Sequence, residues 1–140
     1  QIVSAAQNMA FTLGRARVTF IGPARTQHTD SRDDGLTLRI DYGQTSVVVT
    51  GCITSNGEKE IVSSGAVACD ALIVARGGTE AATCAEWVEA ANPQIALVTG
   101  KNPANSVRIR LQKCGATVYA AKENGVMTLL SDGEKITVEP

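Results

Sequence analysis

The sequence has few aromatic residues, a single histidine and no excess of charge of either sign. Aromatic residues make up 4% of the 140 residues, and His28 is the only histidine. Thirteen Lys and Arg oppose 14 Asp and Glu, so the formal net charge is -1. This balance excludes a strongly basic nucleic-acid clamp and an acidic solvating tail, but it leaves room for a local basic patch.

Long apolar runs and targeting signals are also missing. No apolar run approaches the roughly 20 residues that a membrane-spanning helix needs, and no basic segment followed by an apolar stretch opens the chain. We therefore expect no membrane contact by this chain itself. The first residue is Gln1 rather than Met. We interpret this as a sign of processing or of a longer parent, whose localisation stays open.

The four cysteines argue against a structural metal site. No two of them form a C-x-x-C pair, whereas structural zinc sites use closely spaced Cys and His pairs. Two disulfides are an alternative, with three connectivities. A chain that is 44% hydrophobic does not depend on them, so we predict free, mostly buried thiols. The cysteines are Cys52, Cys69, Cys84 and Cys114.

The length fits one domain over residues 1–140. Alternating and continuous apolar segments predict its strands. Residues 1–15 read as an irregular lead-in, with a strand pair around Gly14 as the alternative. The strands that follow are predicted at 17–21, 36–42, 46–50, 71–75, 94–98, 116–120, 125–130 and 135–138.

Helix signals separate the central strands. A short helix is predicted around 58–62. Thr79 is a candidate N-cap for a helix over 80–91, and Asn102 followed by Pro103 begins a second main helix that Gly115 ends. This order predicts an α/β fold, a mixed sheet with two main helices on one face. We expect Trp87 on the first main helix to be partly exposed.

Four segments in this order resemble a known family: 33–51 (ending TSVVVTG), 71–79 (ALIVARGGT), 93–100 (PQIALVTG) and 108–119 (RIRLQKCGATVY). They are similar to the C-terminal half of metallo-β-lactamase-fold domains, and within these to the extramembrane domain of ComEC-type competence proteins, the DNA-internalisation family. The resemblance covers residues 17–130. It implies one αβ layer of an αββα sandwich and, for a parent of this kind, a soluble domain of a bacterial membrane protein.

The chain departs from this family at the metal ligands. The resemblance places Cys52 where the family has a metal-bridging Asp, and Arg76 and Gly77 where it has a His-His pair. The family's His-x-His-x-Asp-His motif and late Gly-His-Pro segment are absent. Since a hydrolytic zinc site needs about three protein ligands and an open position for water, we predict vestigial metal positions, no bound metal, no cofactor and no catalytic residue. His28 reads as a solvated loop residue.

Three further features are weighed against simpler explanations. Cys52 is the best candidate for a reactive thiol, although a packed small residue is the simpler interpretation. An anion site is predicted where two strand ends meet helix starts on one sheet edge, with a glycine-permitted turn and N-cap as the alternative. A basic stretch on the second main helix is either a solvated face or a nucleic-acid contact. The anion site comprises Arg76, Gly77, Gly78, Thr79, Lys101 and Asn102, and the basic stretch comprises Arg108, Arg110 and Lys113.

Three functions remain open from the sequence. The first is a non-catalytic domain of a ComEC-like protein that supports DNA uptake or binding. The second is part of a metal-dependent, nuclease-like hydrolase whose active-site half is missing from this chain. The third is a structural or protein-interaction module.

The other face of the predicted sheet carries no main helix, and this helix-free sheet face bears on all three functions. It should carry Leu36, Leu38, Ile40, Val47 and Val49, and exposing such a face is costly. The missing N-terminal half, a second copy or residues 1–15 would cover it. A two-fold homodimer is the simplest closed arrangement.

Overall fold

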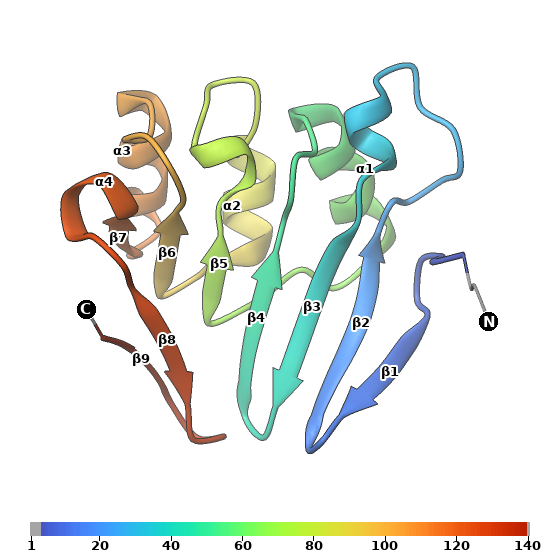
Figure 1. The fold of residues 1–140 in the computed structure, drawn as a ribbon. Coiled ribbons are helices and arrows are strands. Elements are labelled where there is room, and N and C mark those ends of the chain that lie inside the picture. The colour runs from blue at the N-terminus through green and yellow to red at the C-terminus, as the bar shows by residue number, and fades with distance from the viewer. Residues whose placement is uncertain (1–3, 140) are drawn as a thin grey trace.

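The chain forms a seven-stranded mixed sheet with helices on one face, as a computed structural model that describes residues 4–139 shows (Figure 1). The strands lie side by side in chain order. β1 to β4 pair antiparallel, and β4 to β7 pair parallel. The predicted α/β class is confirmed. The strands are β1 (Ala10–Leu13), β2 (Ala16–Gly22), β3 (Thr37–Tyr42), β4 (Thr45–Val49), β5 (Ala71–Ile73), β6 (Ile95–Val98) and β7 (Thr117–Ala120), and β8 (Thr128–Ser131) pairs with β9 (Ile136–Glu139) in a separate hairpin.

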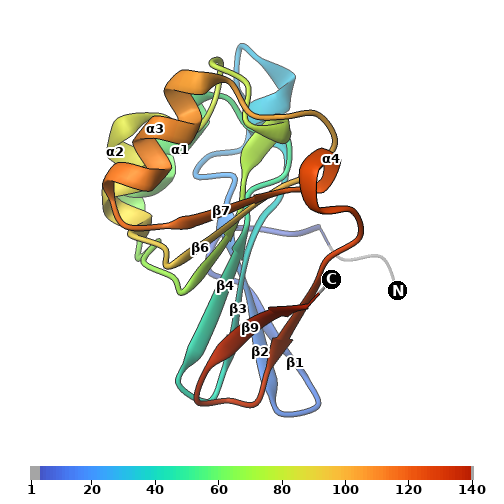
Figure 2. The same ribbon diagram turned by 90° about the vertical axis from the view of Figure 1, so that its left-hand side faces the viewer.

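Three helices, rather than the two main ones expected, cover one face of the sheet (Figure 2). They are α1 (Ser55–Ser64), α2 (Ala85–Ala91) and α3 (Asn105–Lys113). α1 is longer than its predicted segment 58–62 because Thr54 caps it, accepting a hydrogen bond from the amide of Asn56 at 3.2 Å. Three shorter pieces complete the fold: η1 (Ser31–Asp34), η2 (Ala75–Gly77) and α4 (Ala121–Asn124).

The core lies between these helices and the sheet. Val48, Leu72 and Val98 from three adjacent strands are fully buried against Val107 and Leu111 of α3. Trp87 is also fully buried, so the expectation that it is partly exposed is wrong. Its position on the inner side of α2 makes it the largest side chain of this core.

The opposite sheet face carries apolar side chains and is covered by none of α1, α2 and α3 (Figure 2). The register pairs Leu38 with Val49 and Ile40 with Val47, and neither valine belongs to the helix-side core that holds Val48. Partners in register share a face, so these four residues line the helix-free side, as predicted. The β8–β9 hairpin lies on this side of the sheet (Figure 2).

Residues 10–13 extend the sheet instead of forming an irregular lead-in. β1 pairs with β2 around a turn in which Gly14 has φ +61°, which confirms the alternative of a strand pair. The three residues before Ser4 lie outside the described residues. β1 therefore does not cover the helix-free face. Its Phe11 and Leu13 are 50% and 70% exposed and add to that face.

Candidate functional site

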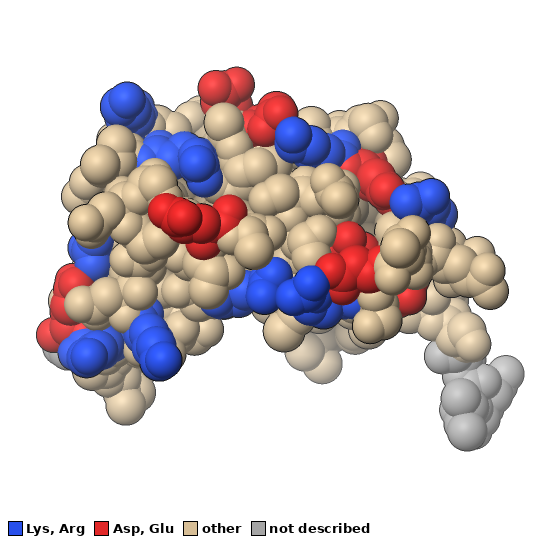
Figure 3. Space-filling model, turned by 90° about the horizontal axis from the view of Figure 1, so that it is seen from above, with Lys and Arg blue, Asp and Glu red and all other residues tan. Residues whose placement is uncertain are grey.

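The carboxyl ends of the parallel strands bring the predicted site residues to one edge of the sheet. Loops leave β4, β5 and β6 at this edge, which is where α/β sheets usually bind ligands. Seen from above, the edge carries basic and acidic residues close to one another (Figure 3). It therefore offers local cationic sites rather than a continuous basic surface.

The turn after β5 is built from three consecutive left-handed residues. Arg76, Gly77 and Gly78 have φ values of +50°, +63° and +74°. The glycines also permit close packing, because a Cβ on Gly77 would lie 2.8 Å from the carbonyl oxygen of Thr99 and one on Gly78 would lie 2.6 Å from Pro103 Cβ. This turn and the loop after β6 are thus held against each other.

Neither predicted N-cap is observed. α2 begins at Ala85, well past Thr79, and α3 begins at Asn105 after Ala104, which makes no side-chain capping bond. The six residues of the predicted anion site nevertheless lie together. All of them line one open hollow of about 620 Å³, with Glu80, Thr99 and Ala104. Tertiary packing, not helix capping, brings them together.

A buried carboxylate already occupies the start of α2. Glu58 of α1 is fully buried and accepts hydrogen bonds from the amides of Thr83 at 2.6 Å and Cys84 at 2.8 Å. Burial raises the pKa of Glu58, and these amide bonds oppose the rise. Because the protein supplies its own acceptor here, the start of α2 is not free for an external anion. The sequence did not reveal this contact, since Glu58 lies 25 residues before Thr83.

Cys52 lies at the same edge, after β4, and its side chain is exposed. The interpretation as a packed small residue is therefore wrong, whereas the reactive thiol stays a prediction. Its neighbour Gly51 accepts a hydrogen bond from the amide of Arg76 at 3.2 Å, so the vestigial positions Cys52, Arg76 and Gly77 are close in space. Among residues 4–139, no group of three or more His, Cys, Asp or Glu side chains is arranged to hold a metal ion.

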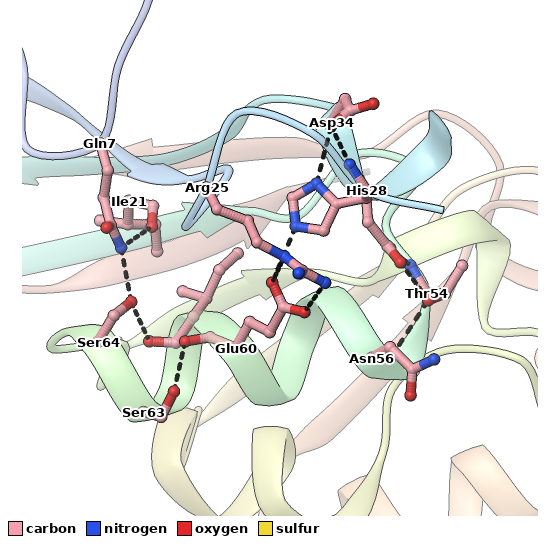
Figure 4. Close-up of polar contacts among 12 residues, drawn as sticks. Gln7, Ile21, Arg25, His28, Asp34, Thr54, Asn56, Glu60, Ser63 and Ser64 are labelled. Atoms are coloured by element: carbon pink, nitrogen blue, oxygen red, sulfur yellow. Dashed lines mark hydrogen bonds and ion pairs between the residues drawn. The ribbon is translucent and has the colours of Figure 1, made fainter. Parts of the chain in front are cut away.

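His28 is not a solvated loop residue. Its side chain is only 3% exposed and lies between two carboxylates (Figure 4). Nδ1 is 2.7 Å from Asp34 and Nε2 is 2.8 Å from Glu60. Arg25 completes the cluster with two hydrogen bonds to Glu60, at 2.7 and 3.1 Å. This His28 cluster fastens the 23–35 loop to α1.

The charges of the His28 cluster stabilise one another. The hydrogen bond to Asp34 is the largest influence on the pKa of His28. Together with the bond to Glu60 it raises that pKa above 6.5, against the opposing effect of burial. Burial alone would raise the pKa of Glu60, but the bonds with His28 and Arg25 together lower it. An ionised carboxylate only accepts hydrogen bonds, so both contacts are hydrogen bonds to ionised carboxylates only when His28 carries a proton on each ring nitrogen.

A second carboxylate orders the same loop from inside. Asp33 is buried and accepts hydrogen bonds from the amide of Thr54 at 2.7 Å and from its hydroxyl at 2.9 Å. The N-cap of α1 is therefore itself held by the loop. Asp33 lines a second open hollow along the edge, about 690 Å³ in volume, together with Arg25, His28 and Glu60 of the His28 cluster.

The predicted basic stretch on α3 does not form one cationic face. Arg108 pairs with Glu123 at 2.5 Å, and Arg110 donates to the carbonyl oxygen of Thr83. Of the three, Lys113 is exposed, whereas Arg108 and Arg110 are half-buried. Two of its three cations are thus used in internal contacts, which weakens the case for α3 as a nucleic-acid surface.

In comparisons with known proteins, no family model matches this chain and no curated protein matches its sequence. Within residues 4–139, none of the helices combines the length and the apolar character required to cross a bilayer.

Proposed function

We propose that this chain is a non-catalytic domain that resembles one αβ layer of a metallo-β-lactamase fold and supports DNA uptake or binding in a ComEC-like protein. The observation that carries the proposal is the composition of the carboxyl edge. Where the resemblance expects Asp and a His-His pair, the edge presents Cys52, Arg76 and Gly77, and the exposed Lys101 lines the same hollow as Arg76 and Gly77. An arginine and a lysine bind phosphates and repel metal ions.

The alternative of a metal-dependent hydrolase is less well supported by the described residues. Hydrolytic metal centres draw on several His and carboxylate ligands. The single histidine already bonds to Asp34 and Glu60 through both ring nitrogens, so neither nitrogen is left to bind a metal ion beside Cys52. A metal site at this edge would have to come from another chain or segment.

Two measurements on the chain test the proposal. Elemental analysis after mild dialysis should give well under about one zinc or manganese per chain, because a catalytic site needs several ligands. A fluorescence-anisotropy titration with a single-stranded oligonucleotide of about 16 nucleotides should show binding that weakens as salt increases. Stoichiometric metal at Cys52 would overturn the non-catalytic assignment, and no DNA binding at low salt would overturn the role in DNA uptake.

Matched charge reversals locate the binding surface. Lys101→Glu should weaken DNA binding by about tenfold, since it replaces a phosphate-facing cation with an anion at the edge. Lys113→Glu makes the same change on α3, where the basic stretch lies, and should leave the affinity within about twofold. If Lys113→Glu weakened DNA binding more than Lys101→Glu, the nucleic-acid surface would lie on α3 and not at the edge.

The helix-free sheet face supports a second function, that of an interaction module. Phe11, Leu13 and Leu36 are 50%, 70% and 46% exposed, and they adjoin the apolar rows of β2, β3 and β4 on that face. Contiguous exposed apolar patches on a folded chain mark interfaces. The partner we expect on this face is a second copy of the chain, which would cover it through a closed two-fold interface.

A further inference from the structure

Arg76 occupies a conformation that the chain gives to glycine at the next two positions. Its φ of +50° lies in the left-handed region, where a side chain is strained. A glycine at this position would relieve the strain. The presence of a large cationic side chain in such a place is a reason to ask what its guanidinium does.

The guanidinium is incompletely satisfied by the protein. Nη1 of Arg76 is buried and has no hydrogen-bond partner within residues 4–139. Arg76 is half-buried and lines both the 620 Å³ hollow and the smaller one beside it, which Arg32 and Thr54 also line. A buried guanidinium N–H without a partner is costly, and a change of side-chain rotamer that turns it toward the hollow would let an anion accept its hydrogen bond.

The acidic groups near Arg76 are already engaged. Asp30 accepts hydrogen bonds from Nε of Arg32 at 2.8 Å and from its Nη2. Glu80 accepts a hydrogen bond from the hydroxyl of Ser106 at 3.0 Å. Neither carboxylate hydrogen-bonds to Arg76, so the guanidinium is left for another acceptor.

A second cation and a rigid frame complete the site. Lys101 is exposed on the same hollow and forms no ion pair among the described residues. The amide of Ala104 donates to the carbonyl oxygen of Gly78 at 2.9 Å. This bond ties the Lys101 loop to the Arg76 turn, so the backbones that carry the two cations keep their relative position around the hollow.

We propose that Arg76 and Lys101 bind a phosphate group in this hollow, with the guanidinium of Arg76 as the principal donor and the hydroxyl of Thr79 beside it. A guanidinium offers two parallel N–H bonds to one phosphate, and the ammonium group adds charge. Free phosphate and the phosphodiester of a nucleic acid share this chemistry. The nucleic-acid form of the inference rests on the proposed function, whereas the phosphate site itself does not.

The test is a phosphate titration followed by amide chemical shifts at constant ionic strength. The amides of Gly78 and Lys101 should shift and saturate with inorganic phosphate at millimolar concentration, the range of a small single-site anion. Arg76→Gly should raise the Kd at least about tenfold, because it removes a charge-assisted hydrogen bond. This variant also relaxes the backbone, so it should remain folded.

Asn92→Gly is the matched control. Asn92 is another left-handed residue, with φ +42°, at the end of α2. The variant makes the same backbone change away from the hollow and should leave the Kd unchanged. Lys101→Ala should weaken phosphate binding by about threefold, because an exposed charge contributes little to the binding free energy. Lys113→Ala lies away from the hollow and should leave phosphate binding unchanged.

The outcomes separate the site from the proposed function. Absence of saturable shifts, or equal binding by Arg76→Gly and the original chain, overturns the phosphate site even if DNA binds elsewhere. Phosphate binding that a single-stranded oligonucleotide displaces supports the site and its role with nucleic acid. Phosphate binding that the oligonucleotide does not displace supports a site for free phosphate and counts against the DNA role.

Discussion

Nε2 of His28 lies 2.8 Å from a carboxylate oxygen of Glu60, 32 residues further along the chain. The second ring nitrogen faces Asp34 at 2.7 Å. Both contacts favour the charged imidazole, so protonation of this one side chain is linked to the position of the 23–35 loop against α1.

The first prediction concerns pH. The pKa of His28 is raised in the folded chain, so its contribution to stability is fully present below about pH 6.5, the pKa of an unperturbed histidine. That contribution is lost as the pH rises through the folded pKa. We expect the free energy of unfolding in urea to fall over this window, and His28→Gln to remove this part of the fall. Because His28 is the only histidine, its imidazole resonances report the pKa directly, and a value at or below 6.5 would contradict the charged cluster.

The second prediction concerns Glu58. Glu58→Ala should destabilise the chain by about 2–4 kcal/mol, because two buried amides lose their acceptor and a cavity opens. Glu58→Gln keeps one oxygen acceptor and should cost about half as much. Equilibrium denaturation measures both. As a control, Glu86→Ala removes an exposed carboxylate of α2 that pairs with Lys59 across exposed surface and should change stability by less than about 1 kcal/mol. Equal effects of Glu58→Ala and Glu86→Ala would refute the role assigned to Glu58.

The strands could be predicted from the sequence, whereas much of the site could not. The strand at Val47, Val48 and Val49 could be predicted from local sequence alone, since runs of β-branched residues favour an extended backbone. Thr79 fails as an N-cap because Glu58, far away in sequence, bonds to the amides at the start of α2 instead. Local capping patterns do not reveal such tertiary partners.

His28 shows the same limit. Its polar neighbours in the sequence predict solvent exposure, and a contact with the nearby Asp34 alone would be compatible with an exposed side chain. Burial results from packing of the loop on α1, where Glu60 lies. In contrast, the grouping of Arg76 with Lys101 could be predicted, because the order of parallel strands places their loops at one edge.

The third prediction concerns thiol reactivity. Burial raises the pKa of Cys69 and of Cys84 to about 12, so at pH 8 only about 1 in 10,000 of either thiol is ionised. Cys52 is exposed. We expect a thiol reagent to modify Cys52 first, with Cys69 and Cys84 reacting only after unfolding. Mass spectrometry of digested samples identifies the modified sites, and Cys52→Ser should abolish the fast phase. Fast modification of Cys69 in the folded chain would show that its part of the core opens readily.

The fourth prediction concerns self-association through the helix-free face. Phe11 and Leu13 are exposed on β1, the edge of that face. A two-fold dimer that covers several hundred Å² of it gains about 25 cal/mol per Å² of apolar area before the cost of association. Sedimentation at about 10–100 μM should therefore show a monomer–dimer equilibrium, in the range expected of an interface of modest size. Leu13→Lys should raise the dissociation constant of the dimer by about tenfold or more, because dimerisation would bury a charge in each copy. Ile109→Lys, a change at a 51% exposed residue of α3 on the helix side, should leave it unchanged. A clean monomer that binds no hydrophobic dye would mean that the β8–β9 hairpin already covers enough of the face, and the dimer would be excluded.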